Sequence, residues 1–178
     1  MKYTETKLQG AFIIEIEPLE DERGSFTRSF CRKEFEKLGL NSEIVQCNVS
    51  SNKKAGTLRG MHFQKAPFEE TKIVSVTKGA IYDVIIDLRK ESETYCKWFS
   101  IELTENNNKM LYIPKGFAHG FQTLVDDTIV YYQMGNYYNP EYTDGVRWDD
   151  PAFNIKRAEC KNRVISEKDK IYKDYDLK

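Results

Sequence analysis

The stretch "KIVSVTKGAIYDVIIDLR" (residues 72–89) contains two β-rich runs that meet at Lys78-Gly79, a dipeptide typical of the turn in a hairpin. The same strand–turn–strand form recurs in residues 98–114, around an Asn-rich turn, and in residues 117–134, around an acidic turn. The sequence contains no βαβ alternation and no GxGxxG motif. We therefore predict three hairpins within an antiparallel all-β sandwich or barrel.

The rest of the chain adds few other elements. Residues 10–19 alternate apolar and polar side chains and predict a further strand, and residues 32–40 predict one short helix that ends near Gly39. From residue 156 onward, the chain is charged and rich in tyrosine, which indicates an irregular surface tail with a helical turn. We predict a single domain over residues 1–178, with a β core at about 10–155.

The composition excludes several classes of protein. The 178 residues include 27 basic and 28 acidic side chains, for a net charge of −1, which argues against a partner that is nucleic acid or a membrane surface. No apolar run approaches the roughly 20 residues that span a bilayer, and the N-terminal residues lack the apolar region of a signal peptide. We expect a cytoplasmic protein whose four scattered cysteines are reduced thiols: Cys31, Cys47, Cys96 and Cys160.

The two histidines, His62 and His119, limit the chemistry that the barrel can hold. Two histidines cannot supply the three-histidine set of many barrel metal sites, so we expect no metal. His62, in "LRGMHFQ" (58–64), is either a core histidine bonded to a backbone carbonyl or a general base held by a carboxylate. In an extended strand Arg59 would point away from the face of His62, unless Gly60 marks a bulge that redirects it.

Six motifs, in this order, carry a resemblance to a known family: "DERGSF", "LRGMHFQ", "GAIYDVIIDLRKES", "IPKGFAHGF", "GVRWDDP" and "ISEKD". Together they resemble the dTDP-4-dehydrorhamnose 3,5-epimerase family, and the match runs over residues 10 to 170. The resemblance implies a cupin-type antiparallel jelly-roll barrel with one or two short helices, a homodimer, and no cofactor or metal. It implies an isomerase of deoxysugar biosynthesis for cell-surface polysaccharides, whose substrate is a nucleotide-diphosphate 4-keto-6-deoxy sugar.

The resemblance also assigns roles to residues. It implies that His62 is the base, that Asp169 orients it, that Tyr132 is the acid and that Lys72 holds the enolate oxygen. Strand parity separates Tyr132 from Tyr131, since only one of the two can face the interior. The expected substrate-binding residues are Arg23, Arg28, Gln46, Asn48, Arg59, His119 and Lys168. Arginine suits a diphosphate because its planar fork forms paired, charge-assisted hydrogen bonds.

Four departures from the family pattern concern the substrate. Arg28 replaces a glutamate, Cys47 an aspartate and Glu70 a glutamine, and "KRAE" follows Ile155 in place of Trp-Pro. The expected catalytic set is intact, so the departures leave open whether one or both of C3 and C5 are inverted and which nucleotide is bound. An alternative from another class is a non-catalytic sugar-nucleotide binding module, although binding alone needs no acid–base pair.

Overall fold

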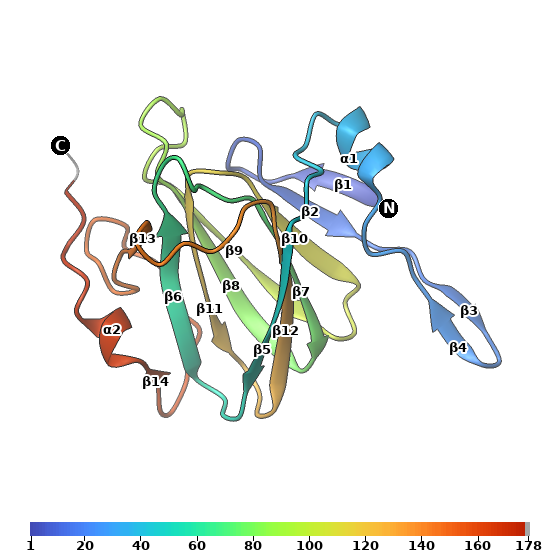
Figure 1. The fold of residues 1–178 in the computed structure, drawn as a ribbon. Coiled ribbons are helices and arrows are strands. Elements are labelled where there is room, and N and C mark those ends of the chain that lie inside the picture. The colour runs from blue at the N-terminus through green and yellow to red at the C-terminus, as the bar shows by residue number, and fades with distance from the viewer. Residues whose placement is uncertain (177–178) are drawn as a thin grey trace.

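The structure, a computed structural model that describes residues 1–176, consists of two β-sheets that face each other (Figure 1). The first sheet contains, in order across it, β1 (Lys2–Glu5), β2 (Phe12–Glu15), β10 (Lys109–Ile113), β7 (Lys72–Lys78), β12 (Thr128–Met134) and β5 (Gln46–Asn52). The second contains β13 (Thr143–Gly145), β6 (Thr57–Gln64), β11 (Phe117–Thr123), β8 (Ala80–Asp87) and β9 (Trp98–Thr104). With helices α1 (Arg32–Lys37) and α2 (Glu167–Lys170), this arrangement confirms the predicted antiparallel all-β fold with one or two short helices.

The predicted hairpins are wrong, although the turns themselves are present. Gly79, Asn108 and Asp127 all have positive φ at the tight turns that follow β7, β9 and β11. The strands on either side of each turn nevertheless belong to different sheets: β7 pairs with β10 and β12, whereas β8 pairs with β9 and β11. A local turn signal reverses the chain but does not choose the hydrogen-bond partner. In this jelly roll each of these turns crosses from one sheet to the other.

The main core fills the space between the two sheets. Ile81 and Ile85 of β8 face inward toward Val74 of β7, and all three are fully buried. The alternate residues of β8 are also covered, since Val84 and Ile86 pack in a second cluster with Phe153 of the C-terminal segment. Burial on both faces explains why β8 reads as a nearly continuous apolar run rather than an alternating one.

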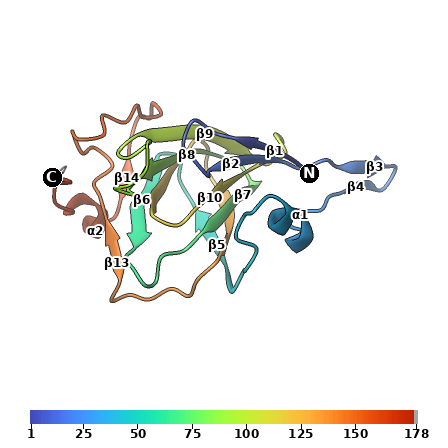
Figure 2. The ribbon, with the colours of Figure 1, turned by 90° about the horizontal axis from the view of Figure 1, so that it is seen from above.

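The N-terminal part of the chain covers the outer face of the first sheet and then leaves the barrel. Phe35 of α1 is fully buried in a third apolar cluster with Ile14 and Tyr112 of that sheet. Between β2 and α1, strands β3 (Leu19–Asp21) and β4 (Gly24–Phe26) form a two-stranded hairpin. This hairpin projects from the body of the molecule, on the side opposite the C-terminal segment (Figures 1 and 2).

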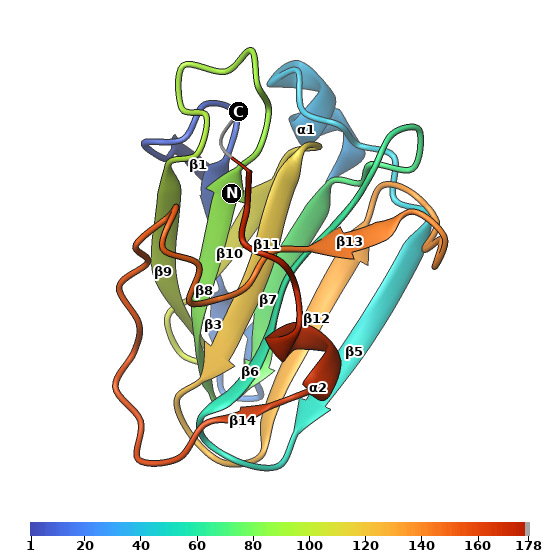
Figure 3. The ribbon, with the colours of Figure 1, turned by 90° about the vertical axis from the view of Figure 1, so that its left-hand side faces the viewer.

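The C-terminal segment returns to the second sheet, where it approaches β6. The short strand β14 (Val164–Ile165) pairs in parallel with Thr57 and Leu58 at the start of β6, and α2 follows directly after it (Figure 3). Ser166 caps α2, since its side chain accepts a hydrogen bond from the backbone amide of Asp169. Neither of the two helices in residues 1–176 has the length and apolar character of a membrane-spanning helix.

Candidate active site

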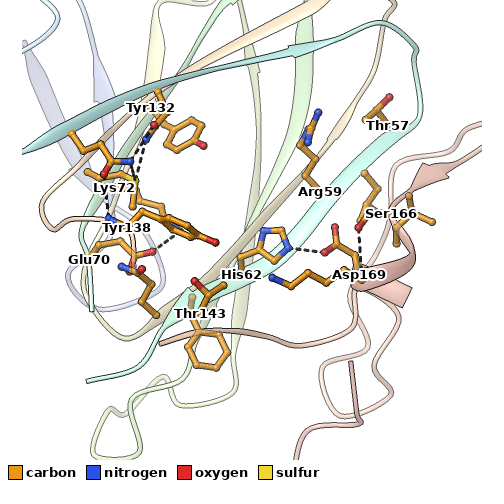
Figure 4. A pocket seen from close by; sticks show the side chains of 18 of the residues that line it. Thr57, Arg59, His62, Glu70, Lys72, Tyr132, Tyr138, Thr143, Ser166 and Asp169 are labelled. Atoms are coloured by element: carbon orange, nitrogen blue, oxygen red, sulfur yellow. Dashed lines mark hydrogen bonds and ion pairs between the residues drawn. The ribbon is translucent and has the colours of Figure 1, made fainter. Parts of the chain in front are cut away.

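A pocket of about 710 Å³ opens between the two sheets, next to α2 (Figure 4). Its walls come from β5, β6, β7 and β12 and from the segment that contains β14 and α2. The polar and charged side chains that line it are Gln46, Asn48, Thr57, Arg59, His62, Gln64, Glu70, Lys72, Tyr132, Tyr138, Thr143, Ser166, Lys168 and Asp169. One pocket therefore contains carboxylates, a histidine, cationic side chains and phenols.

His62 and Asp169 form a dyad at one side of this pocket (Figure 4). Nε2 of His62 lies 2.7 Å from Oδ1 of Asp169, whose side chain is buried, while the imidazole remains partly exposed to the pocket. A carboxylate can only accept, so in the neutral imidazole Nε2 carries the proton and Nδ1 keeps its lone pair. Nδ1 makes no hydrogen bond to any residue in 1–176, which leaves it available to take a proton from a ligand.

Asp169 is held in its ionised form by its own contacts. Burial alone raises the pKa of the Asp169 carboxyl, but the hydrogen bond and electrostatic attraction of the His62 ring, together with the backbone amide of Gly60, outweigh burial and lower it. The Gly60 amide donates to Oδ2 at 3.2 Å, so each carboxylate oxygen has a partner. The charged carboxylate therefore fixes the orientation and the tautomer of His62.

A bulge at Gly60 brings Arg59 to the same pocket as His62. The pairing of β6 with β11 shifts register between His119 and Phe121, where Gly60 adopts a φ of +107°. A Cβ at this position would meet the carbonyl oxygen of His119 at 2.6 Å, so only glycine fits. Of the two alternatives for Arg59, the structure therefore shows the bulge that redirects it: its guanidinium donates to Oδ1 of Asn52 at 2.8 Å and lines the pocket.

Lys72 and Tyr132 lie on neighbouring strands, across the pocket from the dyad (Figure 4). The Lys72 ammonium is mostly buried and lies 2.9 Å from Oε1 of Glu70. The ring of Tyr132 packs against the main core. The backbone carbonyl of the adjacent Tyr131 accepts a hydrogen bond from the hydroxyl of Ser75 on β7. Burial raises the pKa of Tyr132, and the charge of Arg59 opposes this only in part, so the phenol keeps its proton at neutral pH.

His119 belongs to a second histidine–aspartate pair, beside the first. It lies directly opposite His62 across β11 and β6, and its Nε2 is 2.7 Å from Oδ1 of the fully buried Asp83. His119 lines an adjoining cavity of about 250 Å³, whose walls also include Arg59, His62, Lys72 and Tyr132. This cavity therefore extends the pocket to His119.

The structure brings most of the predicted site residues together, but not all of them. His62, Tyr132, Asp169, Lys72, Gln46, Asn48, Arg59 and Lys168 line the main pocket, and His119 lines the adjoining cavity. Arg23 and Arg28 line neither cavity: Arg23 pairs with Asp21 on the β3–β4 hairpin, and Arg28 pairs with Glu34. Within one subunit, the prediction that these two arginines contact the same ligand as His62 has no support.

Sequence reasoning missed some pocket residues and misjudged a departure. Glu70 was identified only as a departure from the family pattern. It stands two residues before Lys72, a spacing that in an extended chain directs both side chains to the same side, and in the structure the two form an ion pair. Cys47 is exposed and absent from the pocket, whereas Gln46 and Asn48 on either side of it line the pocket.

No group of three or more His, Cys, Asp or Glu side chains within residues 1–176 is arranged to hold a metal ion.

Comparisons with known proteins identify relatives over nearly the whole chain. The sequence profile of a family described as dTDP-4-dehydrorhamnose 3,5-epimerase matches residues 5–176. A dTDP-4-dehydrorhamnose 3,5-epimerase from Methanothermobacter thermautotrophicus is 42% identical over 174 residues, which covers 97% of this chain and 93% of the relative.

Solved structures agree with the sequence matches. A crystal structure of the Bacillus anthracis dTDP-4-dehydrorhamnose 3,5-epimerase, with TDP and PPi bound, has a TM-score of 0.93 and 44% identity, covering 98% of this chain and 99% of that one. A 3,5-epimerase from Legionella pneumophila in complex with dTDP-4-keto-L-rhamnose has a TM-score of 0.92 and 35% identity, covering 97% of this chain and 92% of that one.

Proposed function

The chain belongs to the dTDP-4-dehydrorhamnose 3,5-epimerase family, and we propose that His62, Asp169, Tyr132 and Lys72 carry out the reaction in the pocket. The enzyme is an isomerase with a cupin-type fold that acts on dTDP-4-keto-6-deoxyglucose at C3 and C5, so the predicted family and activity are confirmed. The single observation that supports these residue roles is the His62–Asp169 dyad, which faces Tyr132 and Lys72 across one pocket.

The C4 ketone makes this chemistry possible without a redox step. The protons at C3 and C5 are acidic because each carbon is adjacent to the carbonyl. Nδ1 of His62 removes one of them, and the electron pair of the broken C–H bond moves toward the carbonyl oxygen to give an enolate. The ammonium of Lys72, in the same pocket, provides the positive charge that stabilises this oxygen.

Inversion requires that the returning proton arrive on the opposite face. Tyr132 holds a proton at neutral pH, and its ring comes from β12 in the opposite sheet to His62 of β6. Donation from the phenol to the carbon restores the ketone and inverts the centre. The cycle leaves an imidazolium and a phenolate, which exchange protons with solvent before the second centre reacts.

The experiment that tests this function is proton exchange in heavy water with dTDP-4-keto-6-deoxyglucose, followed by NMR. We expect deuterium to enter C3 and C5 and the product to have both centres inverted. Exchange at only one carbon would reassign the chain to single-centre epimerisation. Saturable binding of the nucleotide sugar without exchange at either carbon would instead favour the binding module considered as the alternative.

We further propose a homodimer in which the β3–β4 hairpin of one subunit packs against its partner. The hairpin projects from the body of the molecule, and its apolar residues Leu19 and Phe26 are 73% and 74% exposed (Figure 2). Such exposed apolar side chains are typical of a protein interface. The side chains of Arg23 and Arg28 are also largely exposed, so the same packing would bring these expected substrate-binding residues to the partner's pocket.

Light scattering at micromolar concentration should therefore give the mass of a dimer. Replacing Leu19 and Phe26 together by serine removes the apolar contact and should shift the mass toward the monomer value. Because both side chains are solvent-exposed within one subunit, the thermal unfolding of the barrel should change little. A monomer mass for the unmodified chain at this concentration would contradict the proposal.

We also propose that the enzyme works in the cytoplasm, within dTDP-rhamnose biosynthesis. The near-neutral net charge of −1 and the absence of a long apolar run in the sequence support this location.

A further inference from the structure

Glu70 is a buried carboxylate that the reaction described above leaves unexplained. Its side chain is only 5% exposed, and Oε1 lies 2.9 Å from the ammonium of Lys72. Its second oxygen, Oε2, is buried and has no hydrogen-bond partner in residues 1–176. Glu70 lines the main pocket together with Lys72 and Tyr138 (Figure 4). A buried acceptor without a donor is unfavourable, so this oxygen is suited to a donor that a ligand supplies.

The position of Lys72 limits which ligand group can reach Oε2. In the proposed reaction the Lys72 ammonium lies at the C4 oxygen of the sugar, and the same ammonium contacts Glu70. A group that reaches Oε2 is therefore a near neighbour of C4. On a 4-keto-6-deoxyhexose, C5 carries a methyl group, which donates no hydrogen bond, whereas C3 carries a hydroxyl, which does.

We infer that Oε2 of Glu70 accepts a hydrogen bond from the C3 hydroxyl of the sugar, and that Glu70 thereby selects substrates with a donor at C3. This inference rests on the proposed function, because it takes the position of the sugar from the role of Lys72. One carboxylate then contacts both the residue at the C4 oxygen and the substituent on a carbon that is inverted. The site acquires a chemical difference between C3 and C5, two carbons that the C4 ketone activates equally.

The test is a binding cycle that needs no turnover. The ligands are dTDP-6-deoxyglucose, which has no ketone and cannot epimerise, and its 3-deoxy and 2-deoxy analogues. Their dissociation constants are measured by calorimetry for the unmodified enzyme, for Glu70→Met, which removes the acceptor at similar size, and for Glu70→Gln. Binding of dTDP alone is the control for folding, because it should be equal in all three proteins.

Loss of the 3-hydroxyl should weaken binding to the unmodified enzyme by about 10-fold to 100-fold, the effect of one hydrogen bond to a charged group. In Glu70→Met, loss of the 3-hydroxyl should weaken binding by less than about threefold, because the acceptor of its hydrogen bond has already been removed and the two effects do not add. Glu70→Gln, which keeps the size but replaces the charged acceptor, should lie between the two. Loss of the 2-hydroxyl should weaken ligand binding by the same factor in all three proteins.

An equal penalty for the 3-deoxy ligand in the unmodified enzyme and in Glu70→Met would overturn the inference. If Glu70→Met does not bind dTDP, the comparison rests on Glu70→Gln, and an undiminished 3-hydroxyl effect in that variant overturns the inference as well. The heavy-water experiment reports separately on the proposed function. A failure there, with the coupling to the 3-hydroxyl intact, leaves Glu70 as a ligand-binding residue in a protein that does not turn over.

Discussion

Replacing His62 with glutamine should lower the rate of deuterium exchange at C3 and C5 by about 10²–10⁴-fold, the usual effect of losing a general base. The glutamine amide can still donate a hydrogen bond from a position close to that of Nε2, so the buried carboxylate of Asp169 keeps a partner. It offers no basic nitrogen where Nδ1 stood. The fold should therefore survive while proton abstraction stops, as NMR in heavy water would measure.

Asparagine at position 62 provides a matched comparison, because it is equally inactive as a base but too short to reach Asp169. That variant leaves Oδ1 of the buried Asp169 carboxylate without its partner and should unfold at a lower temperature than the glutamine variant. The two histidines also permit a direct check of the tautomer, since the imidazole ¹⁵N spectrum contains only two rings. Unchanged exchange in the glutamine variant, or a proton on Nδ1 of His62 at neutral pH, would remove His62 from this role.

Strand parity separated Tyr132 from Tyr131, and the family resemblance chose Tyr132. In the structure Tyr132 and Val130 both pack with the main core, and Tyr132 lines the pocket. Strand parity also places Asp83 on the same face of β8 as the buried Ile81 and Ile85. An acidic residue on the inner face of an apolar strand implies a buried partner, and in the structure that partner is His119.

Local sequence patterns could not place contacts that depend on the route of the chain. Only the family resemblance paired Asp169 with His62, and the two meet across 107 residues because β14 pairs with β6 and brings α2 to the pocket. The three predicted hairpins failed for the same reason, since turn residues specify a reversal but not the sheet to which the next strand belongs. Arg23 and Arg28 have no ligand position within one subunit, and their expected role depends on an assembly that local patterns do not encode.

Replacing Tyr132 with phenylalanine should separate proton abstraction from inversion. The change removes one hydroxyl and keeps the ring that packs against the core, so the barrel should remain intact. His62 and Asp169 are untouched, and deuterium should still enter the sugar. Inversion at C5 should slow by about 10²–10⁴-fold, because the proposed proton donor on the opposite face is removed. C3 can behave differently if water reaches it, in which case a singly inverted product accumulates.

Tyr131→Phe is the matched control, since it removes the same hydroxyl from the adjacent residue, which parity directs to the other face of the sheet. One NMR time course on the three proteins, following both carbons, distinguishes the outcomes. Double inversion at the normal rate by Tyr132→Phe would exclude Tyr132 as the acid, and a defect in Tyr131→Phe would transfer the role to that residue. Retained exchange with failed inversion at C5 requires that the base and the acid be different groups on opposite faces of the sugar. This is the arrangement expected from a dyad on β6 and a phenol on β12.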